Sequence, residues 1–408
     1  MTTRSQPEGG GLSRGLLMLM SAATGLAVAG NYFAQPLLDL ISRELDVGPE
    51  LAGLIVTAAQ AGYALGLMLL VPLGDLMERR RLAVLLYAAT AVFLLVSATA
   101  VNGAVLLVGT ALTGLASVGA QVVVPFAAAL AAPAERGKVV GTVMTGLMLG
   151  LLVARTASGA LADLGGWRTV YWVDAALMAA MAVLLRAFLP RLGSADSGLT
   201  YPGLLRTTLS MFRDEPLLRW RAGIGALSLA SFSVLWTALT FLLSGPGYGW
   251  SESSIGSVGL LGVVGALTAT FAGRLADRGL VQVVSGAGTV LLVASWAASA
   301  AGGGSLFWLL TGVVVLDLAH QAVLNSTQNV LYALRPEARN RINSAFMTSL
   351  FLGGAVGSAL TSAVWAHGGW NAVCVLGAAF SAGTVVLWLL ERLTTARAAN
   401  VTPAPSTH

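Results

Sequence analysis

Long runs of apolar residues alternate with short polar segments along the whole chain. A helix needs about 20 apolar residues to cross the roughly 30 Å of hydrocarbon in a bilayer, so each run of that length is a candidate transmembrane helix. The chain contains twelve such runs, separated by clusters of charged residues, glycine or proline. They are centred near Ala27, Gly62, Leu94, Val118, Gly150, Met178, Ser231, Val264, Leu292, Ala319, Gly354 and Gly383. The pattern predicts an all-α integral membrane protein with twelve transmembrane helices.

The longest polar interruption divides these runs into six and six. We therefore expect an N-terminal six-helix bundle over residues 14–189 and a C-terminal six-helix bundle over residues 222–393. The cytoplasmic central loop, residues 190–221, contains an amphipathic, arginine-rich stretch that should lie on the membrane surface. The tails, residues 1–13 and 394–408, are expected to be disordered and cytoplasmic.

The composition excludes several classes of function. Hydrophobic residues make up 56% of the 408 residues and charged residues only 10%, which leaves too little polar surface for a soluble protein. The single cysteine, Cys374, excludes a disulfide framework, and the three histidines lack the spacing of zinc ligands. ATP hydrolysis has no support, because the sequence has no P-loop with a lysine. We expect no metal, no cofactor and no enzymatic activity.

The positive charges predict how the chain is oriented in the membrane. The net charge is +5, but the basic residues occur in short groups between apolar runs, which argues against a nucleic-acid partner. If the N-terminus is cytoplasmic, only Arg43 and Arg168 fall in outside loops. Because lysine and arginine are retained on the cytoplasmic side, we expect both termini to be cytoplasmic, in a bacterial inner membrane.

The second half of the chain repeats the first at a constant offset of 203 residues. The matching pairs are Pro133 with Pro336, Arg136 with Arg339, Met144 with Met347, Thr145 with Thr348, Gly150 with Gly353, and the Gly-Gly-Trp of residues 165–167 with that of residues 368–370. An even number of helices preserves orientation, so the two bundles are expected to be parallel repeats. Such repeats place a cavity between the bundles near the bilayer midplane, and rocking of one bundle against the other can open it to either side.

Two loops carry a recognisable motif. Residues 72–81 read PLGDLMERRR and residues 273–278 read GRLADR. Both resemble the GxLaDrxGrr signature of the major facilitator superfamily, although Val71 and Glu78 replace glycines in the first loop. With the duplication, this resemblance covers essentially the whole chain and implies the major facilitator fold. It also implies that the loops form an inner gate, with candidate gating residues Asp75, Arg79, Arg80, Asp277 and Arg278. The alternative is a solvated loop whose arginines only set the orientation.

Two further segments indicate a subgroup of that superfamily. Residues 154–159 read ARTASG, which partly resembles the GPxxGG-like motif of its drug/proton antiporters. Arg155 replaces the proline of that motif, and Thr110 occupies a position that is usually arginine. Residues 31–38, NYFAQPLL, are similar to an NyyaQPLL segment of bacterial exporter-like members. The chain thus resembles twelve-helix, drug/proton antiporter-like exporters.

Few charged residues are expected near the middle of the bilayer, where a charge is costly. Asp317 and His320 lie about midway along the tenth span and are candidates for proton coupling. His320 could instead be a neutral packing group that donates to Asp317 or to a backbone carbonyl. Arg155 in the fifth span is a fixed charge that could hold a protein carboxylate or an anionic substrate. Its alternative role is an interface arginine that pairs with carbonyls or extends to the membrane surface.

Polar stripes on two helices are expected to face the cavity. In the tenth span, steps of three, four, eight and eleven residues from Asp317 place four further polar residues on one helical face. The fourth span carries a weaker stripe of Thr110, Thr113, Ser117 and Gln121. The candidate substrate-cavity residues are Asn31, Gln35, Gln60, Tyr63, Gln121, Trp236, Gln321, Asn325 and Gln328. Each could equally be a packing or hydrogen-bonding group between helices.

These observations predict a secondary active transporter that works by alternating access as a monomer in the lipid bilayer. Its partners are a small-molecule substrate and protons, and the expected activity is proton-coupled efflux of small, partly apolar molecules. The alternatives are an uptake symporter, a facilitator, or a membrane receptor that does not transport.

Overall fold

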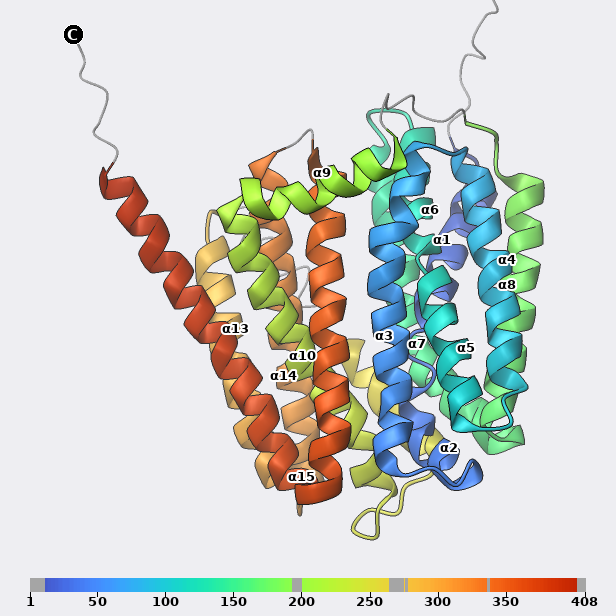
Figure 1. The fold of residues 1–408 in the computed structure, drawn as a ribbon, viewed down its shortest axis with the longest axis vertical. Helices are drawn as coiled ribbons and strands as arrows, with labels where there is room; N and C mark the ends of the chain where they lie inside the picture. Colours follow the sequence, from blue (N-terminus) through green and yellow to red (C-terminus); the bar gives the residue numbers. More distant parts are fainter. Residues whose placement is uncertain (1–11, 193–199, 264–274, 276–277, 336–337, 402–408) are drawn as a thin grey trace, which may run out of the picture.

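The structure is a computed structural model that describes residues 12–192, 200–263, 275, 278–335 and 338–401. These residues form long helices that run roughly parallel to one another in two adjacent groups, one from each half of the chain (Figure 1). The described residues include no strand. The predicted all-α architecture is confirmed.

Short and long helices build the six spans of the first half, and two of these spans are interrupted. Pro36, which has no backbone N–H, lies where the first span changes from α1 to α2. The fourth span is divided at Ser117 and Val118. The elements are α1 (Arg14–Ala29), η1 (Gln35–Leu37), α2 (Leu38–Glu44), α3 (Pro49–Leu69), η2 (Val71–Asp75), α4 (Arg79–Ala98), α5 (Gly103–Ala116), α6 (Gly119–Leu130), α7 (Arg136–Gly165) and α8 (Trp167–Phe188).

The second half begins with a surface helix and continues with the remaining spans. The long element α15 is two antiparallel helices that turn at Gly369, whose φ of 55° is not helical (Figure 1). The predicted centre of the eighth span, Val264, lies outside the described residues. The elements are α9 (Tyr201–Asp214), α10 (Pro216–Ser244), α11 (Glu252–Ser257), η3 (Val258–Leu261), α13 (Val281–Ala301), α14 (Leu306–Leu334) and α15 (Arg339–Val401).

The described residues contain nine segments that are long and apolar enough to cross a bilayer. Three spans are missing from that number for identifiable reasons. The helix of the first span ends early at its break, the eleventh and twelfth spans are joined in α15, and the eighth lies partly outside the described residues. The arrangement is that of the predicted twelve-helix fold.

Two boundaries differ from the expected ones. The helix α10 begins at Pro216, a residue type favoured in the first turn, rather than after residue 221. Arg221, assigned to the polar loop because of its charge, is fully buried, and its Nη2 lies 2.7 Å from Oε1 of Glu391. The other difference is at the C-terminus, where α15 continues to Val401 instead of ending near residue 393.

The same helix pairs pack together in the two halves. A Cβ added at Gly150 of α7 would lie 2.2 Å from the carbonyl oxygen of Gly25 in α1. A Cβ added at Gly353 of α15 would lie 2.1 Å from the carbonyl oxygen of Ala226 in α10. Glycine allows the two backbones to touch at both places. The fifth span therefore contacts the first as the eleventh contacts the seventh.

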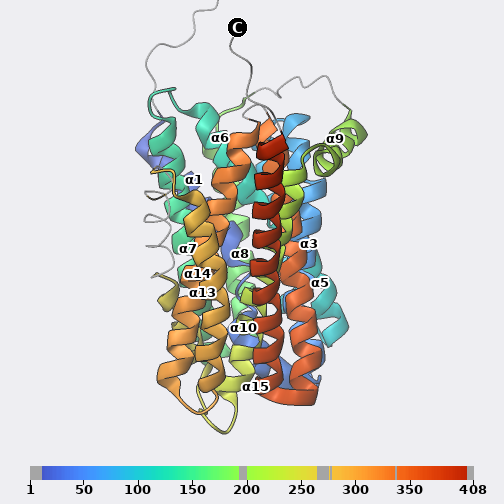
Figure 2. The same cartoon turned by 90° about the vertical axis from the view of Figure 1, so that its left-hand side faces the viewer.

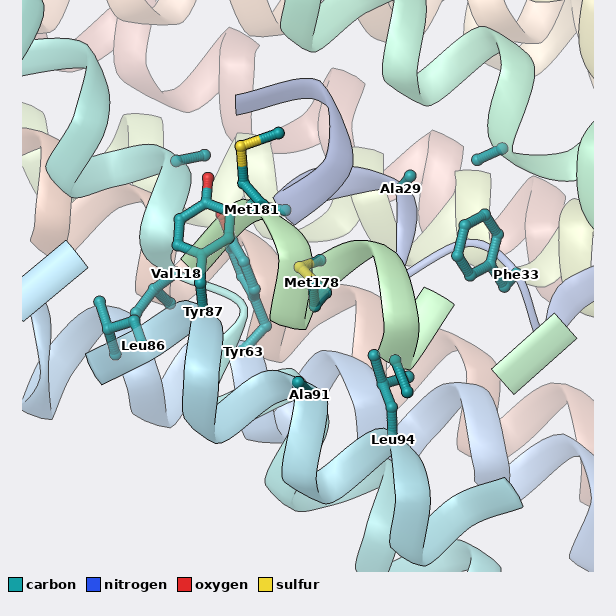
Figure 3. Packing of buried hydrophobic residues seen from close by; sticks show 14 of the residues in the cluster. Ala29, Phe33, Tyr63, Leu86, Tyr87, Ala91, Leu94, Val118, Met178 and Met181 are labelled. Carbon is teal, nitrogen blue, oxygen red and sulfur yellow. The ribbon is translucent and has the colours of Figure 1, made fainter. Parts of the chain in front are cut away.

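Buried apolar side chains fill the interior of the first bundle. Tyr87 and Leu94 of α4 lie on the side toward α8, which carries Met178 and Met181, and Leu86 lies beside Val118 (Figure 3). The hydroxyl of Tyr87 donates to the carbonyl oxygen of Ala23 at 2.6 Å. A buried phenol needs such a partner in an apolar core, and this bond connects α4 to α1.

The helix α9 lies near one end of the molecule, which we call the α9 face (Figures 1 and 2). Its buried side includes Leu204, Thr208 and Met211. The hydroxyl of Tyr201 donates to the carbonyl oxygen of Leu69 at 2.8 Å, which fixes the start of α9 against the first bundle. The helix α15 also ends at this face (Figure 1).

The two halves meet directly at the end opposite the α9 face, along two seams. In one seam α3 packs on α15, where the hydroxyl of Ser358 donates to the carbonyl oxygen of Gly53 at 3.2 Å. In the other seam α7 packs on α11, and the hydroxyl of Thr156 donates to the carbonyl oxygen of Gly256 at 3.1 Å. The ion pair of Arg43 with Glu252, 3.3 Å, adds a contact between the halves. The opposite face is therefore closed.

Candidate functional site

A cavity of about 700 Å³ lies between the two halves and extends to the α9 face. Residues near its mouth include Asp75, Arg79 and Arg341, together with Leu204 of α9. Its deep end is lined by Arg155 of α7 and by residues of α14. The molecule is therefore hollow toward one face and closed toward the other.

One face of α7 forms an apolar wall of this cavity. The wall is a row of side chains at helical spacing that ends at Arg155: Val140, Met144, Leu147, Met148, Leu151 and Leu152. The facing wall is α14, which presents Asp317, His320, Gln321, Asn325 and Gln328. All five residues predicted to share one face of this span thus line the cavity. A molecule in this space meets apolar groups on one side and hydrogen-bonding groups on the other.

Arg155 lies at the deep end of the cavity, with 4% of its surface exposed. Its Nε donates to Oε1 of Gln35 at 2.7 Å. Its Cζ lies 3.9 Å from the ring centroid of Trp236, 4.9 Å from that of Tyr32 and 5.8 Å from that of Phe232. The two Nη atoms have no hydrogen-bond partner among the described residues. One side of the guanidinium is thus held in place, while its terminal donors are free.

Three glycines allow the eighth span to pack over Arg155. A Cβ at Gly256 would lie 2.4 Å from the backbone oxygen of Arg155, and a Cβ at Gly259 would lie 3.0 Å from its Cβ. A Cβ at Gly262 would lie 3.2 Å from Leu152. A 3₁₀ helix such as η3 has three residues per turn, so Gly259 and the capping residue Gly262, three residues apart, lie on one side.

Asp317 also lies at the deep end of the cavity, and 8% of its surface is exposed. Its Oδ1 accepts a hydrogen bond from Nε1 of Trp236 at 3.4 Å. None of the salt bridges among the described residues includes Asp317. Trp236 therefore contacts both charged residues, by its ring face on Arg155 and by its ring edge on Asp317.

His320 and Asp317 contact different residues of α10. Its Nδ1 lies 2.9 Å from the hydroxyl of Ser228 in α10, and its ring centroid lies 4.9 Å from that of Phe232. Neither residue hydrogen-bonds to the other within the described structure. The predicted donation from His320 to Asp317 or to a backbone carbonyl is replaced by the hydroxyl contact.

The remaining candidate cavity residues divide into two groups. Tyr63 of α3 and Gln121 of α6 line the cavity. Asn31, Gln35, Gln60 and Trp236 are buried behind its wall. Gln35 and Trp236 hold Arg155, and Nε2 of Gln60 donates to the hydroxyl of Ser233 in the other half at 3.0 Å. These side chains support the site or the contact between the halves rather than face the cavity.

Two of the candidate gating residues lie near the mouth of the cavity. Asp75 and Arg79 line it, and an Nη atom of Arg79 donates to the carbonyl oxygen of Pro125 at 3.4 Å. Arg80 donates to the carbonyl oxygen of Arg186. Arg278 is exposed, and Asp277 lies outside the described residues.

The aromatic side chains around Arg155 were not predicted from the sequence as a group. Tyr32 lies within the NYFAQPLL segment, and Phe232 is four residues before Trp236 on α10. That spacing places Phe232 and Trp236 on one helical face, and it is the feature of the sequence that indicates an aromatic pair there. Their convergence on Arg155 depends on the packing of three helices.

Two helical halves that enclose a cavity open at one face form the architecture of a membrane transporter. The family model of the Major Facilitator Superfamily matches residues 20–332 and 222–407, and the chain belongs to that superfamily. The chain is 50% identical over 377 residues to the "putative uncharacterized transporter YgaY" of Escherichia coli, which covers 92% of this chain and 95% of that protein. It is 34% identical over 397 residues to the "probable transporter SCO4007" of Streptomyces coelicolor, covering 92% and 88% of the two chains.

The fold is also similar to that of a solved transporter. A bacterial homologue of the human lysosomal transporter Spinster, in an inward-facing and occupied conformation, superposes with a TM-score of 0.72. The match covers 95% of this chain and 96% of that chain at 16% identity. The protein is thus a multi-pass membrane transporter with the major facilitator fold, and its partners are the bilayer and a small molecule.

Proposed function

We propose that this transporter exports small, partly apolar molecules from the bacterial cytoplasm in exchange for protons. The observation that carries this proposal is the position of Asp317 at the deep end of a cavity that extends to one face. A carboxyl group fixed in a salt bridge stays ionised, whereas Asp317 is held by an indole N–H at 3.4 Å. It can therefore gain and lose a proton when water reaches it from alternate sides.

The α9 face is the cytoplasmic face in this proposal. Arg79, Arg80, Arg136 and Arg341 lie in the loops or helix ends of this face, and such clusters remain on the cytoplasmic side of bacterial inner membranes. The cavity would then be open to the cytoplasm, from which a substrate to be exported must enter.

The mixed walls of the cavity support a partly apolar substrate. The α7 wall is apolar, and the α14 wall carries amide side chains that can hydrogen-bond a polar group. His320 lies beside Asp317 on α14 but binds Ser228, so its part in this proposal is to tune the site rather than to carry the proton.

Flux measurements on the full chain in proteoliposomes test the proposal. Vesicles containing the pH dye pyranine are given a proton gradient and a library of small compounds, and release of protons is recorded with each compound. We expect a subset of partly apolar compounds to dissipate the gradient while they accumulate on the opposite side. The Asp317→Asn variant should lose accumulation against a gradient while it still exchanges substrate across the membrane.

The matched control is Asp163→Asn, an exposed acid of α7 away from the cavity lining. It should transport as the wild type does. Full accumulation by Asp317→Asn would exclude Asp317 as the proton carrier and favour facilitated diffusion. Accumulation in the same direction as proton entry would favour an uptake symporter, and no flux of any compound would favour a receptor.

A further inference from the structure

We propose that the substrates of this transporter are small amphipathic monoanions whose carboxylate, or an oxyanion of similar shape, binds the Nη groups of Arg155. This inference rests on the proposed transport function and adds the chemical class of the substrate. Its starting point is a buried positive charge at the deep end of the cavity whose terminal donors have no hydrogen-bond partner in the part of the chain that the structure describes.

The first step concerns the charge of Arg155. A guanidinium removed from water is costly unless an anion or a set of acceptors compensates it. Arg155 has 4% of its surface exposed, and its only hydrogen bond among the described residues is the one to Gln35. Three aromatic rings contribute cation–π contacts, which leave the hydrogen-bond donors of the Nη atoms unused. An anion at that edge would complete the site.

The protein carboxylate that acts electrostatically on Arg155 is that of Asp317. No ion pair within 4.0 Å joins Arg155 to Asp317. Trp236 lies against both residues: its ring face contacts Arg155, and its Nε1 donates to the carboxylate of Asp317. The Nη groups of Arg155 thus have no ion-paired carboxylate among the described residues, and an anion from outside the protein can bind them.

The guanidinium of Arg155 is held in one orientation. The bond from Nε to Gln35 and the ring of Trp236 at 3.9 Å fix the plane of the guanidinium. A guanidinium that is already oriented loses little side-chain freedom on binding, and its two Nη atoms match the two oxygens of a carboxylate. The site is therefore preorganised for a planar oxyanion.

The fourth step gives the shape of the remaining substrate. Leu151 and Leu152 lie one turn from Arg155 toward the mouth, and Leu147 and Met148 lie one turn farther. An anion at Arg155 would therefore extend its body along an apolar surface. The α14 wall offers Gln321 and Asn325 to any hydroxyl or amide on the other side of that body. An acid group at one end of an apolar skeleton fits both walls.

The other charged residues of the cavity also favour a negatively charged substrate. The charged residues that line the cavity are Arg79, Arg155 and Arg341 against Asp75 and Asp317. The two arginines at the mouth would attract an anion from the α9 face. A cationic substrate would have to approach past these arginines and would be repelled by Arg155 at the deep end.

Binding to the purified full-length protein tests the proposal without a flux assay. The probes are ω-phenylalkanoates of increasing chain length, and for each length the primary amide and the ammonium of the same skeleton. Calorimetry at pH 7 gives the dissociation constant of each. We expect at least one acid to bind roughly ten- to a hundredfold more tightly than its amide, because charge-assisted hydrogen bonds to a guanidinium are about twice as strong as neutral ones.

Two substitutions identify the residue responsible. Arg155→Gln should remove the preference for acid over amide, and Arg155→Lys should keep the preference but bind the acid more weakly, because the planar fork is lost. The control is Arg136→Gln, which removes an exposed arginine at the start of the same helix and should bind as the wild type does. Thermal unfolding and gel filtration show whether each variant is folded, and the comparison of probes on the wild type needs no variant.

Three results would overturn the proposal: binding of the amides as tight as that of the acids, binding of none of the acids, or an unchanged acid preference in Arg155→Gln.

The Asp317→Asn variant separates the proposal of anion binding from that of proton coupling. It should retain the acid preference, since Asp317 does not pair with Arg155. If Asp317→Asn loses coupled flux but retains acid binding, both proposals are supported. If Asp317→Asn shows normal coupled flux, only the proposal of proton coupling is overturned.

Discussion

The guanidinium of Arg155 stacks on the indole of Trp236, with Cζ 3.9 Å from the ring centroid. The edge of the same indole donates to Asp317 at 3.4 Å. One neutral side chain thus positions a fixed positive charge and a titratable carboxyl group that come from different halves of the molecule. Because Trp236 contacts both, its two roles can be separated by substitution.

The first prediction concerns those two roles. Trp236→Phe keeps an aromatic face under Arg155 and removes the donor to Asp317, whereas Trp236→Leu removes both. A cation–π contact is worth about 0.5–2 kcal/mol, so Trp236→Leu should weaken acid binding by roughly two- to thirtyfold. Trp236→Phe should retain most of that affinity but alter the pH dependence of flux. Calorimetry and flux at several pH values measure the two effects, and equal acid binding by both variants would contradict the role of the ring.

The second prediction concerns the glycine contact over Arg155. A Cβ at Gly256 would lie 2.4 Å from a backbone oxygen of α7, so Gly256→Ala must separate α11 from α7. Overpacking costs about 1–3 kcal/mol, which should shift the population toward a state open at the face opposite α9 by roughly fivefold or more. Spin labels on Glu50 and Gly247, exposed residues near that face, would report a longer distance. Gly141→Ala in α7 has no atom within 4 Å of its added Cβ and should change nothing.

The third prediction concerns the ion pair between the halves. Glu252→Gln removes the partner of Arg43 on the second half, while Arg43 keeps Asp39 at 2.9 Å. Exposed ion pairs are worth about 0.2–1 kcal/mol, so the population open at that face should rise by at most about fivefold at low salt. The same spin labels should show that this difference disappears at high salt, because ions screen exposed charges. A difference that persists at high salt would point to a cause other than the ion pair.

The fourth prediction concerns the loop at the mouth of the cavity. Asp75 lines the mouth and takes part in no salt bridge among the described residues. If it binds the other half only when the mouth closes, Asp75→Asn should slow flux without reducing the amount of folded protein. Glu135→Gln, an exposed acid before α7, is the control. Unchanged flux in Asp75→Asn would leave the loop with the single role of orienting the chain.

The fifth prediction concerns a buried acid away from the cavity. Asp174 of α8 is 1% exposed, and neither of its carboxyl oxygens has a hydrogen-bond partner in the described structure. An unsatisfied buried polar group costs about 1–3 kcal/mol or more, so Asp174→Leu should raise the free energy of unfolding by an amount of that order. Thermal unfolding in detergent measures the change. A less stable protein would mean that a bound water or ion satisfies Asp174.

The sequence predicts the polar wall of the cavity because that wall depends on one helix only. Asp317, His320, Gln321, Asn325 and Gln328 share a face by helical spacing, and a polar face in a membrane must avoid lipid. The twelve-helix fold follows from the lengths of the apolar runs for the same reason. Each of these inferences uses local periodicity and the cost of exposing polar groups to lipid.

The sequence does not predict which polar residues of the other helices reach the cavity. Gln60 and Gln121 have similar local patterns, yet Gln60 binds Ser233 across the closed seam and Gln121 lines the cavity. The difference depends on which residues of the second half pack against α3 and α6, which local sequence does not encode. The burial of Arg221 is not predictable for a related reason, since its partner Glu391 is distant in the sequence.

The two seams between the halves occupy equivalent positions of the duplicated chain, yet they do not carry the same chemistry. Arg155 and Ser358 are 203 residues apart, as are Gly256 and Gly53, so each seam joins the same pair of positions. At one position stands Arg155, whose Nη donors have no hydrogen-bond partner among the described residues, and at the other stands Ser358, whose hydroxyl donates to a backbone carbonyl. The backbone contacts of the two seams are thus nearly symmetric, while the proposed ligand site lies at one of them only. A change of the side chain at position 155 could therefore alter substrate specificity without altering the backbone contacts of the two seams.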